Sequence, residues 1–188
     1  IDFGTGCTVN GVTRKGKILI TYSGERRQAG SSHSMSFDGY YVDGIKIEGT
    51  RTVEVAEISL TSITHEITLE NGKITWPDNS FLTRTAHHFR RWVWNGTLAR
   101  LDDEMRILEG GSAEGQNRNG KGYAMQITED VVFKAECGRN KRFLPASGEK
   151  VLSVDNKIIT VDYGSGDCDN SVTVTVNGES REVTVTRG

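Results

Sequence analysis

Asp162-Tyr163-Gly164-Ser165-Gly166-Asp167-Cys168, near the end of the chain, has a counterpart at the start in Asp2-Phe3-Gly4-Thr5-Gly6-Cys7. Both stretches hold an acid, an aromatic residue, a Gly-x-Gly pair and a cysteine, and each is followed by a run with β-strand character. A chain that opens and closes with the same pattern is typical of one all-β domain whose terminal strands are built alike.

Between these stretches, apolar and polar residues alternate in short runs. In the first run, Ile18, Ile20 and Tyr22 share one face, which is the two-residue period of a strand. Asn-Gly and Asp-Gly pairs favour the tight turns of β-hairpins, and the chain has them at 10–11, 38–39, 43–44, 71–72, 95–96, 119–120 and 177–178. We therefore expect a single all-β domain, an antiparallel meander that forms a sandwich or a strongly curved sheet.

Strands are expected over 16–22, 34–42, 45–57, both sides of a bend in 58–69, 73–76, 81–94, 123–128, 131–135, 150–154, 157–162, 172–176 and 183–185. Residues 110–122 are rich in Gly, Asn and Ser and indicate a loop. A helix over Leu98–Leu108 is the one rival interpretation, because apolar residues recur there at helical spacing. The similar phrases at 14–17 and 118–121 suggest that residues 1–188 contain two similar halves.

The composition and charge of the chain limit the classes of function that it can have. The net charge of −2 gives no basic footprint for nucleic acid, and no apolar run reaches the length that crosses a membrane. Only 35% of the residues are hydrophobic, which suits a sheet with one face in water.

The chain has three cysteines and no C-x-x-C pair, which excludes a zinc ribbon or a thioredoxin motif. In an exported protein one pair is expected to be bridged, and Cys137 with Cys168 is the pair we favour. The alternative is three buried free thiols that pack as small apolar side chains.

The longest expected strand carries the best candidate site. Its even positions include Arg84, Arg90, Trp92 and Trp94, and its odd positions include Phe89 and Val93. If the odd face points inward, the even face presents indole rings beside guanidinium groups, which suits sugars with acidic substituents. The alternative is that both tryptophans belong to the core and that the arginines pair with Asp102, Asp103 or Glu104.

The acidic residues of the closing stretch and the histidines were considered as metal ligands. Asp162, Asp167, Asp169 and Asn170 supply oxygen atoms of the kind that bind Ca²⁺, but they lack EF-hand spacing and fit a tight turn equally well. His87 and His88 are adjacent in a strand and point to opposite faces, so they cannot chelate one ion. We expect no metal and no cofactor.

No catalytic motif is present: the chain has neither a Gly-x-Ser-x-Gly elbow nor a Walker loop. We expect a protein that is not an enzyme and assign no catalytic residues. A glycoside hydrolase stays an alternative, because two carboxylates can meet in space without a sequence signature.

Several phrases resemble a known family. They are Arg14-Lys15-Gly16-Lys17-Ile18, Val42-Asp43-Gly44, Glu48-Gly49-Thr50-Arg51, Ile74-Thr75-Trp76-Pro77-Asp78, Asn117-Arg118-Asn119-Gly120 and the closing Asp162-Tyr163-Gly164 to Cys168-Asp169-Asn170. Together they look like the uncharacterised exported lipoprotein domains of Bacteroides-type bacteria. The resemblance covers nearly the whole chain and implies export, a lipid anchor upstream of Ile1 as the link to the membrane, and a periplasmic or cell-surface location in the cell envelope. It supplies no catalytic residues.

Our leading hypothesis is therefore a surface or periplasmic binding module that contacts a glycan through Arg84, Arg90, Trp92 and Trp94. The second is a structural or assembly subunit that binds another envelope protein through an exposed edge strand.

Overall fold

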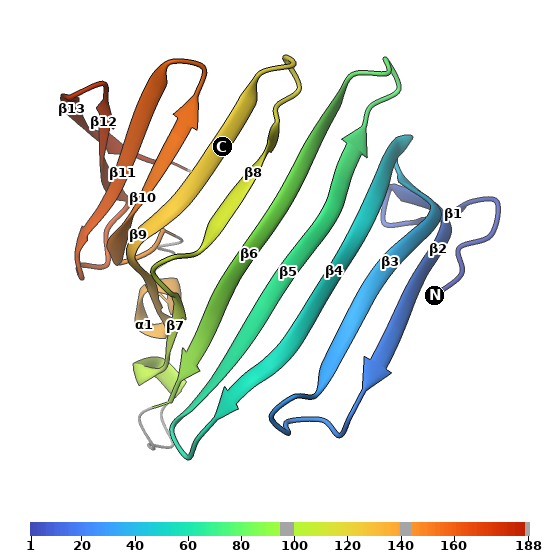
Figure 1. Cartoon of the computed structure of the whole chain (residues 1–188), viewed down its shortest axis with the longest axis horizontal. Helices are drawn as coiled ribbons and strands as arrows, with labels where there is room; N and C mark the ends of the chain where they lie inside the picture. The colour runs from blue at the N-terminus through green and yellow to red at the C-terminus, as the bar shows by residue number, and fades with distance from the viewer. Residues whose placement is uncertain (95–99, 140–143, 187–188) are drawn as a thin grey trace.

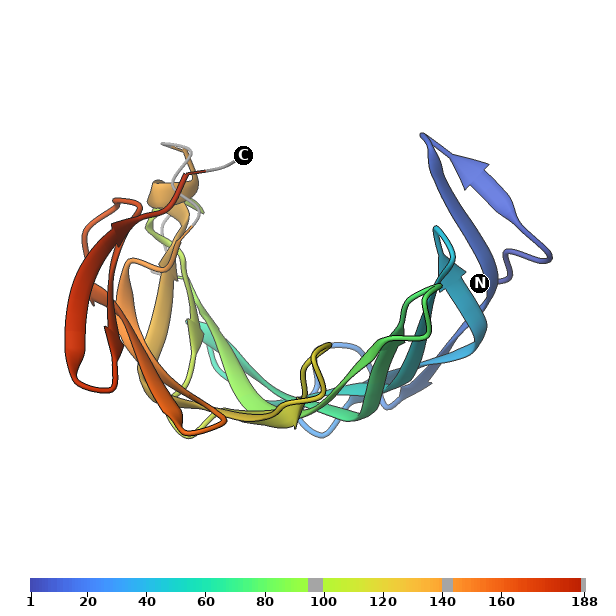
Figure 2. The ribbon, with the colours of Figure 1, turned by 90° about the horizontal axis from the view of Figure 1, so that it is seen from above.

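A computed structural model describes residues 1–94, 100–139 and 144–186. These residues form one sheet of 13 antiparallel strands, most of which pair with the next strand along the chain (Figure 1). The sheet bends into an open trough rather than folding into two packed layers (Figure 2). The predicted all-β antiparallel meander is confirmed, and of the two expected forms the strongly curved sheet is the one observed.

The strands are β1 (Cys7–Val9), β2 (Val12–Ser23), β3 (Ser32–Val42), β4 (Ile45–Ile58), β5 (Ser62–Thr75), β6 (Phe81–Val93), β7 (Glu104–Ile107), β8 (Ser112–Gln116), β9 (Gly122–Lys134), β10 (Ser147–Val154), β11 (Lys157–Ser165), β12 (Ser171–Val176) and β13 (Glu179–Thr184). Two short helices complete the described chain, the 3-10 helix η1 (Arg100–Asp102) and α1 (Ala135–Arg139). No helix in these ranges is long and apolar enough to cross a membrane.

The strand pairing fixes which side chains share a face. On β6 the even positions lie beside buried neighbours: Ala86 is opposite Ala113 of β8, and His88 is opposite Ile67 of β5. Apolar side chains of β9, β11 and β12 on this same face pack together, with Ile127 and Tyr163 in one cluster. Side chains from strands that are not neighbours can meet only on the inside of the curve. The even face of β6 is therefore the concave face of the trough.

The main apolar cluster lies where the last strands curl. Its buried members are Ile127, Val131, Tyr163 and Val172, and partly buried residues up to Val185 pack against them. β4, β5 and β6 occupy the floor of the trough, and the first and last strands form its walls (Figure 2). The curled wall thus contains most of what serves as a core.

A line of glycines, which we call the glycine seam, crosses the sheet from β2 to β8. Its members are Gly16, Gly39, Gly49, Gly72 and Gly115. A Cβ on Gly16 would stand 2.0 Å from the Gly39 carbonyl oxygen, and one on Gly49 would stand 2.7 Å from the Cα of Gly72. Pairing shifts accompany the seam on β2, β3, β4 and β5. Bulges of this kind bend strands, so the seam contributes to the curvature of the sheet.

The seam also explains two wrong predictions. Asp38-Gly39 and Asn71-Gly72 were expected to mark turns, although the first pair lies within the strand expected over 34–42. Each is a bulge inside a continuous strand, β3 and β5. Asn71 and Gly39 have φ values of 51° and 55°, and a bulge can use such residues as readily as a hairpin can. The predicted break of β5 at 71–72 is accordingly absent. The expected turns at 10–11, 43–44, 119–120 and 177–178 are observed, whereas Asn95-Gly96 lies outside the described residues.

In three further segments the observed secondary structure differs from the predicted one. The predicted loop at 110–122 contains β8, which pairs with β6 and β9. The expected strands at 123–128 and 131–135 are one bulged strand, β9. In the range where a helix was the alternative, residues 98 and 99 are not described, a 3-10 turn covers 100–102 and β7 covers 104–107.

The favoured disulfide is confirmed. Cys137 of α1 is bonded to Cys168, which follows β11, with a sequence separation of 31 residues. Cys7 is free and exposed, so the alternative of three buried thiols is wrong. The bridge ties α1 to the curled wall of the trough.

The two matching end stretches adopt the same turn. The Gly4 amide donates to Asp2 Oδ1 at 2.8 Å, and the Gly164 amide donates to Asp162 Oδ1 at 2.7 Å. The aromatic residue between them packs inward in both cases: Phe3 lies against Tyr40, and Tyr163 belongs to the core cluster. The shared sequence therefore encodes a shared local structure.

The seam predicts a steric penalty at Gly115. A Cβ there would stand 2.0 Å from the Thr83 carbonyl oxygen, so Gly115→Ala should lower the unfolding free energy by about 2 kcal/mol or more. Gly138→Ala is the control, because its Cβ meets nothing within 4 Å and it lies in α1. In urea denaturation, Gly138→Ala should change the unfolding free energy by less than about 1 kcal/mol, and any change should be stabilising. Equal stability of the two variants would contradict the steric role of the seam.

The disulfide predicts a redox-dependent stability. Replacing both Cys137 and Cys168 by alanine should lower the unfolding free energy by about 2–4 kcal/mol, because the unfolded chain gains freedom. A reducing agent should bring the wild-type protein to the same midpoint in a thermal melt. Cys7→Ser should leave the midpoint unchanged, since that thiol is exposed and free. A wild-type melt that is insensitive to reductant would contradict the assigned bridge.

Candidate functional site

The concave face contains a cavity of 830 Å³ at the end of the trough where the β2–β3 and β4–β5 connections lie. Its apolar floor comes from Val53, Val55 and Ile63 on β4 and β5. Rings stand around this floor, and two arginines of the β2–β3 connection line it as well. None of the described residues that line the cavity is acidic.

Trp92 is the ring most available to a ligand. It lies near the end of β6, opposite Ile63 of β5 and Met105 of β7, and its side chain is half-exposed at 43%. The Arg90 guanidinium lies 5.9 Å from the centre of its ring, which is within the range of a cation–π contact. An exposed indole beside a cation is the arrangement that stacks on a sugar and attracts a negative substituent.

Trp94 is held more tightly. Its indole Nε1 donates to the Leu60 carbonyl at 2.5 Å, and its backbone amide donates to the Thr61 carbonyl at 2.9 Å. Both acceptors belong to the connection between β4 and β5, so that connection fixes the indole at the end of the cavity. Trp94 is half-buried and gives the cavity a rigid wall.

Three more rings come from strands distant in sequence. Tyr22 of β2 and His33 of β3 are paired in register, and their ring centres are 6.0 Å apart. His65 of β5 is opposite Arg90. No local signal in the sequence identifies these three as site residues, because only the successive pairing of strands β2, β3, β4, β5 and β6 brings them together.

Arg26 and Arg27 reach the cavity from the β2–β3 connection. That connection is fastened to β4, since the Gly30 amide donates to the Val55 carbonyl and the Val55 amide donates to the Ser31 carbonyl, both at 2.8 Å. The Ser31 hydroxyl donates to the Gln28 carbonyl at 2.6 Å. The two arginines therefore sit on an anchored segment at the edge of the cavity.

Positive charge on the concave face shifts several pKa values. Burial, followed by the nearby Arg90, lowers the pKa of His65. Burial and the charges of Arg90, Arg51 and Arg84 lower the pKa of His88 to about 4. Burial and the neighbouring Arg51 also lower the pKa of Arg90 itself. All three shifts disfavour the protonated form, first through burial and then through the neighbouring arginines of this face.

Three of the four predicted contact residues come together here. Trp92 and Trp94 line the cavity, and Arg90 lies over the Trp92 ring. Arg84 is separate, because it lies near the opposite end of β6 between Gly72 and Gly115. Among the described residues, Arg84 and Arg90 form no ion pair, and Glu104, one of their suggested partners, is bound by Arg106 at 2.6 Å.

The orientation of β6 on which the binding hypothesis depended differs from the observed one. That hypothesis supposed that the odd positions point inward, but they lie on the convex face, where His87 contacts Glu66 at 2.7 Å and Arg91 Nε donates to Thr64 Oγ1 at 2.9 Å. β6 carries apolar and charged residues on both faces, so its own alternation does not decide the matter. The buried neighbours Ile67 and Ala113 do.

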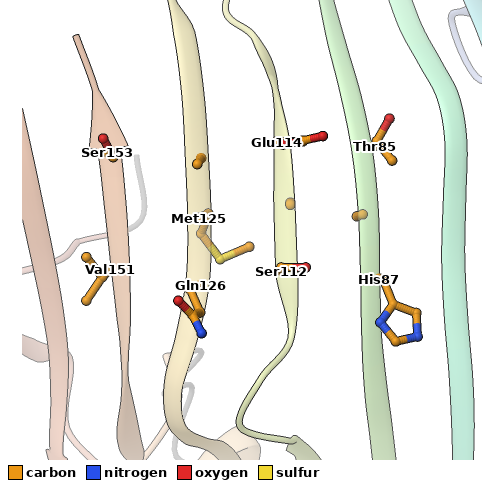
Figure 3. Close-up of a pocket in the computed structure, with 11 residues that line it drawn as sticks. Thr85, His87, Ser112, Glu114, Met125, Gln126, Val151 and Ser153 are labelled. Carbon is orange, nitrogen blue, oxygen red and sulfur yellow. The ribbon is translucent and has the colours of Figure 1, made fainter.

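A second hollow of 480 Å³ lies across β6, β8, β9 and β10. Its polar lining includes Thr85, His87, Ser112 and Glu114 (Figure 3). These residues occupy the strand positions between the concave ones, so they face the convex side. Although Ser112 is paired with His87 in register, no hydrogen bond joins their side chains in the described structure. His87 instead uses Nε2 for Glu66. Among the described residues that line this hollow, the one ring is His87, which contacts Glu66, and none is an arginine or a lysine.

The other candidate features have local structural explanations. Asp162 and Asp169 each accept a hydrogen bond from the backbone amide two residues ahead, which is the tight-turn interpretation of that stretch. The last strand in the described sheet, β13, is short and carries Glu179, Arg181 and Glu182. Charges on an edge strand discourage pairing with another chain.

Comparison of the chain with family models, curated proteins and solved structures gives no match. The resemblance to exported lipoprotein domains therefore stays a prediction.

The lowered pKa of His88 predicts that stability falls with acid. Below about pH 6.5 an unfolded chain binds a proton at this imidazole, whereas the folded protein keeps it neutral down to about pH 4. The unfolding free energy should therefore decrease between about pH 7 and about pH 4.5. His88→Gln should show a smaller decrease in urea titrations, while His87→Gln, on the convex face, should retain the decrease due to His88. An unchanged pH dependence in His88→Gln would contradict this assignment.

Proposed function

We propose that the protein is an exported binding module, not an enzyme, that holds an acidic glycan in the concave cavity. The observation that carries the proposal is the half-exposed Trp92 on a cavity without acidic lining, with the Arg90 guanidinium 5.9 Å from its ring. Sugar C–H groups stack on an indole face, and guanidinium groups bind carboxylates or sulfates through paired hydrogen bonds.

The size and shape of the cavity support a sugar ligand. A volume of 830 Å³ lies in the range of small-molecule sites and leaves room for more than one ring. The aromatic walls come from both sides, with Tyr22 on β2 and Trp92 on β6, and Trp94 is pinned by two hydrogen bonds. Rigid rings lose little freedom when a ligand binds, so they favour affinity.

The charge distribution supports an acidic ligand over a neutral one. Arg26 and Arg27 line the cavity, and Arg90 lies beside it. Burial, and after it the repulsion from neighbouring arginines, lowers the pKa of His65 and Arg90. A carboxylate or sulfate placed between these groups would relieve the repulsion. A neutral sugar would leave that repulsion in place.

Export is supported by the disulfide. The Cys137–Cys168 bridge is of a kind that persists in oxidising compartments and is rare in the cytosol. A periplasmic or cell-surface module that binds glycans fits this chemistry.

The proposal predicts that Trp92 is required for binding. Trp92→Ala should weaken the affinity for a galacturonic acid dimer by about tenfold, which corresponds to about 1.4 kcal/mol of lost stacking. Trp76→Phe is the matched control, because Trp76 lies at the end of β5 under Arg118, outside the residues that line the cavity. Isothermal titration should show that Trp76→Phe binds the acidic dimer with wild-type affinity. The wild type should bind the neutral galactose dimer more weakly than the acidic dimer.

Tryptophan fluorescence in the Trp76→Phe background gives a second readout. Iodide should quench the exposed Trp92, and the acidic dimer should protect it. If the acidic dimer does not bind, or if Trp92→Ala binds it as well as the wild type, the proposed site is wrong.

A further inference from the structure

We infer that the ligand is an extended acidic oligosaccharide, which leaves the cavity and runs along the trough floor over the cations of β6 as far as Arg84. This inference rests on the proposed function and names the class of glycan that the site takes. It arises from what the concave face carries outside the cavity.

The concave side of β6 forms a row that begins at the cavity. From Trp92 the row continues through Arg90, His88 and Ala86 to Arg84, as the pairing with β5 and β8 shows. Arg51 of β4 joins it from the side, because Arg51 is opposite Leu69, which is in turn opposite Ala86. β6 runs along the floor of the trough (Figure 2), so the row forms part of the surface that an occupant would touch.

The cations of this row lack acidic partners. Within the described parts of the chain, Arg51, Arg84 and Arg90 form no ion pair. Three arginines outside the row are paired: Arg91 with Glu57 at 3.6 Å, Arg106 with Glu104 at 2.6 Å and Arg118 with Asp78 at 2.8 Å. Arg14 and Arg181, like the cavity arginines Arg26 and Arg27, form no ion pair among the described residues. The row thus places three unpaired guanidinium groups together on the concave face, in a protein whose net charge is −2. A face of this kind is complementary to a polyanion.

The structure leaves Arg84 uncovered. Its two neighbours across the sheet are Gly72 on β5 and Gly115 on β8, which have no side chains of their own. Leu69 packs against Gly72, and the Tyr123 hydroxyl reaches across Gly115 to donate to the Thr83 carbonyl at 3.3 Å, so these two side chains border the position. Arg84 is exposed, and it belongs to the concave set of even positions on β6. The glycine seam, which bends the sheet, therefore also opens a place for an anionic group.

The spacing requires a chain rather than a single sugar. Arg84 and Arg90 are six positions apart, which is about 20 Å along a strand. Arg26 and Arg27 lie beyond Trp92 at the far side of the cavity. A ligand that reaches both ends must carry several negative groups along its length.

The same row argues against a lipid. An acyl chain needs a continuous, dry apolar surface, but on β6 the charged and polar residues Arg84, His88 and Arg90 interrupt the apolar ones. Trp92 and Tyr22 are exposed at 43% and 74%, as suits rings that stack in water. Sugar rings with acidic substituents match this alternation of rings and cations.

The test compares ligand length. Dimers and octamers of galacturonic acid are titrated against the wild type, the Arg51→Gln/Arg84→Gln double variant and Arg91→Gln. Arg91 is the matched control, because it lies on the same strand but points to the convex face and pairs with Glu57. The wild type should bind the octamer about tenfold more tightly than the dimer, since additional charged units engage the row.

The double variant should bind the dimer as the wild type does, but its preference for the octamer should fall to about threefold or less. Its octamer affinity should also depend less on salt between about 50 mM and about 200 mM NaCl, because fewer charged contacts release counterions. Arg91→Gln should retain the full octamer preference. A circular dichroism melt confirms that each variant is folded.

Each other outcome has a distinct meaning. An octamer preference that survives in the double variant, or an equal loss for dimer and octamer, overturns the inference while leaving the cavity proposal in place. Failure of the dimer to bind the wild type refutes the proposed function itself. If vesicles containing phosphatidylglycerol bind in a manner that requires Arg51 and Arg84, while the octamer does not, the row serves a lipid surface and the inference is wrong.

Discussion

Close backbone contact along the glycine seam is the constraint on which the trough depends. At Gly16, Gly49 and Gly115 a single methyl group would collide with the backbone of the adjacent strand. The strands can therefore approach and bulge there without losing their neighbours, and β2 to β6 stay paired over most of their length. Because matching bulges occur on adjacent strands, side chains on either side of the seam remain on consistent faces. The row of cations and the aromatic cavity both require that consistency.

Some of the fold was predictable because short stretches of sequence determine it. Period-two alternation located the strands, and Asn10-Gly11, Asp43-Gly44 and Asn177-Gly178 marked real hairpins with positive φ values. Local chemistry could not separate a hairpin from a bulge, since Asp38-Gly39 and Asn71-Gly72 meet the same backbone need inside strands. Nor could it find β8, whose sequence Ser-Ala-Glu-Gly-Gln has weak strand character and is held by β6 and β9 on either side.

The candidate site was likewise predictable only where its residues lie on one strand. The sequence predicted Arg90, Trp92 and Trp94 because they follow one another on a single strand. It assigned them to the wrong side, since burial of β6 is decided by Ile67 and Ala113 on neighbouring strands. Tyr22, His33 and His65 were missed because they approach Trp92 only through strand pairing, which takes four steps from Tyr22, three from His33 and one from His65. Residues that are joined across a sheet leave no joint signal in one sequence.

The trough is one layer thick over most of its width, and this has a consequence for how it comes apart. Each strand touches chiefly the strand on either side, as in a repeat protein, so its stability approximates a sum of nearest-neighbour terms. Opening then proceeds as fraying from the two ends of the array, with β4 to β6 the last to exchange their amide protons. The bridge at Cys137–Cys168 ties α1 to the segment after β11, so that only β12 and β13 lie beyond it at that end. The β1 end has no disulfide among the described residues. The two ends of the array therefore differ in how many strands can separate before a covalent link resists.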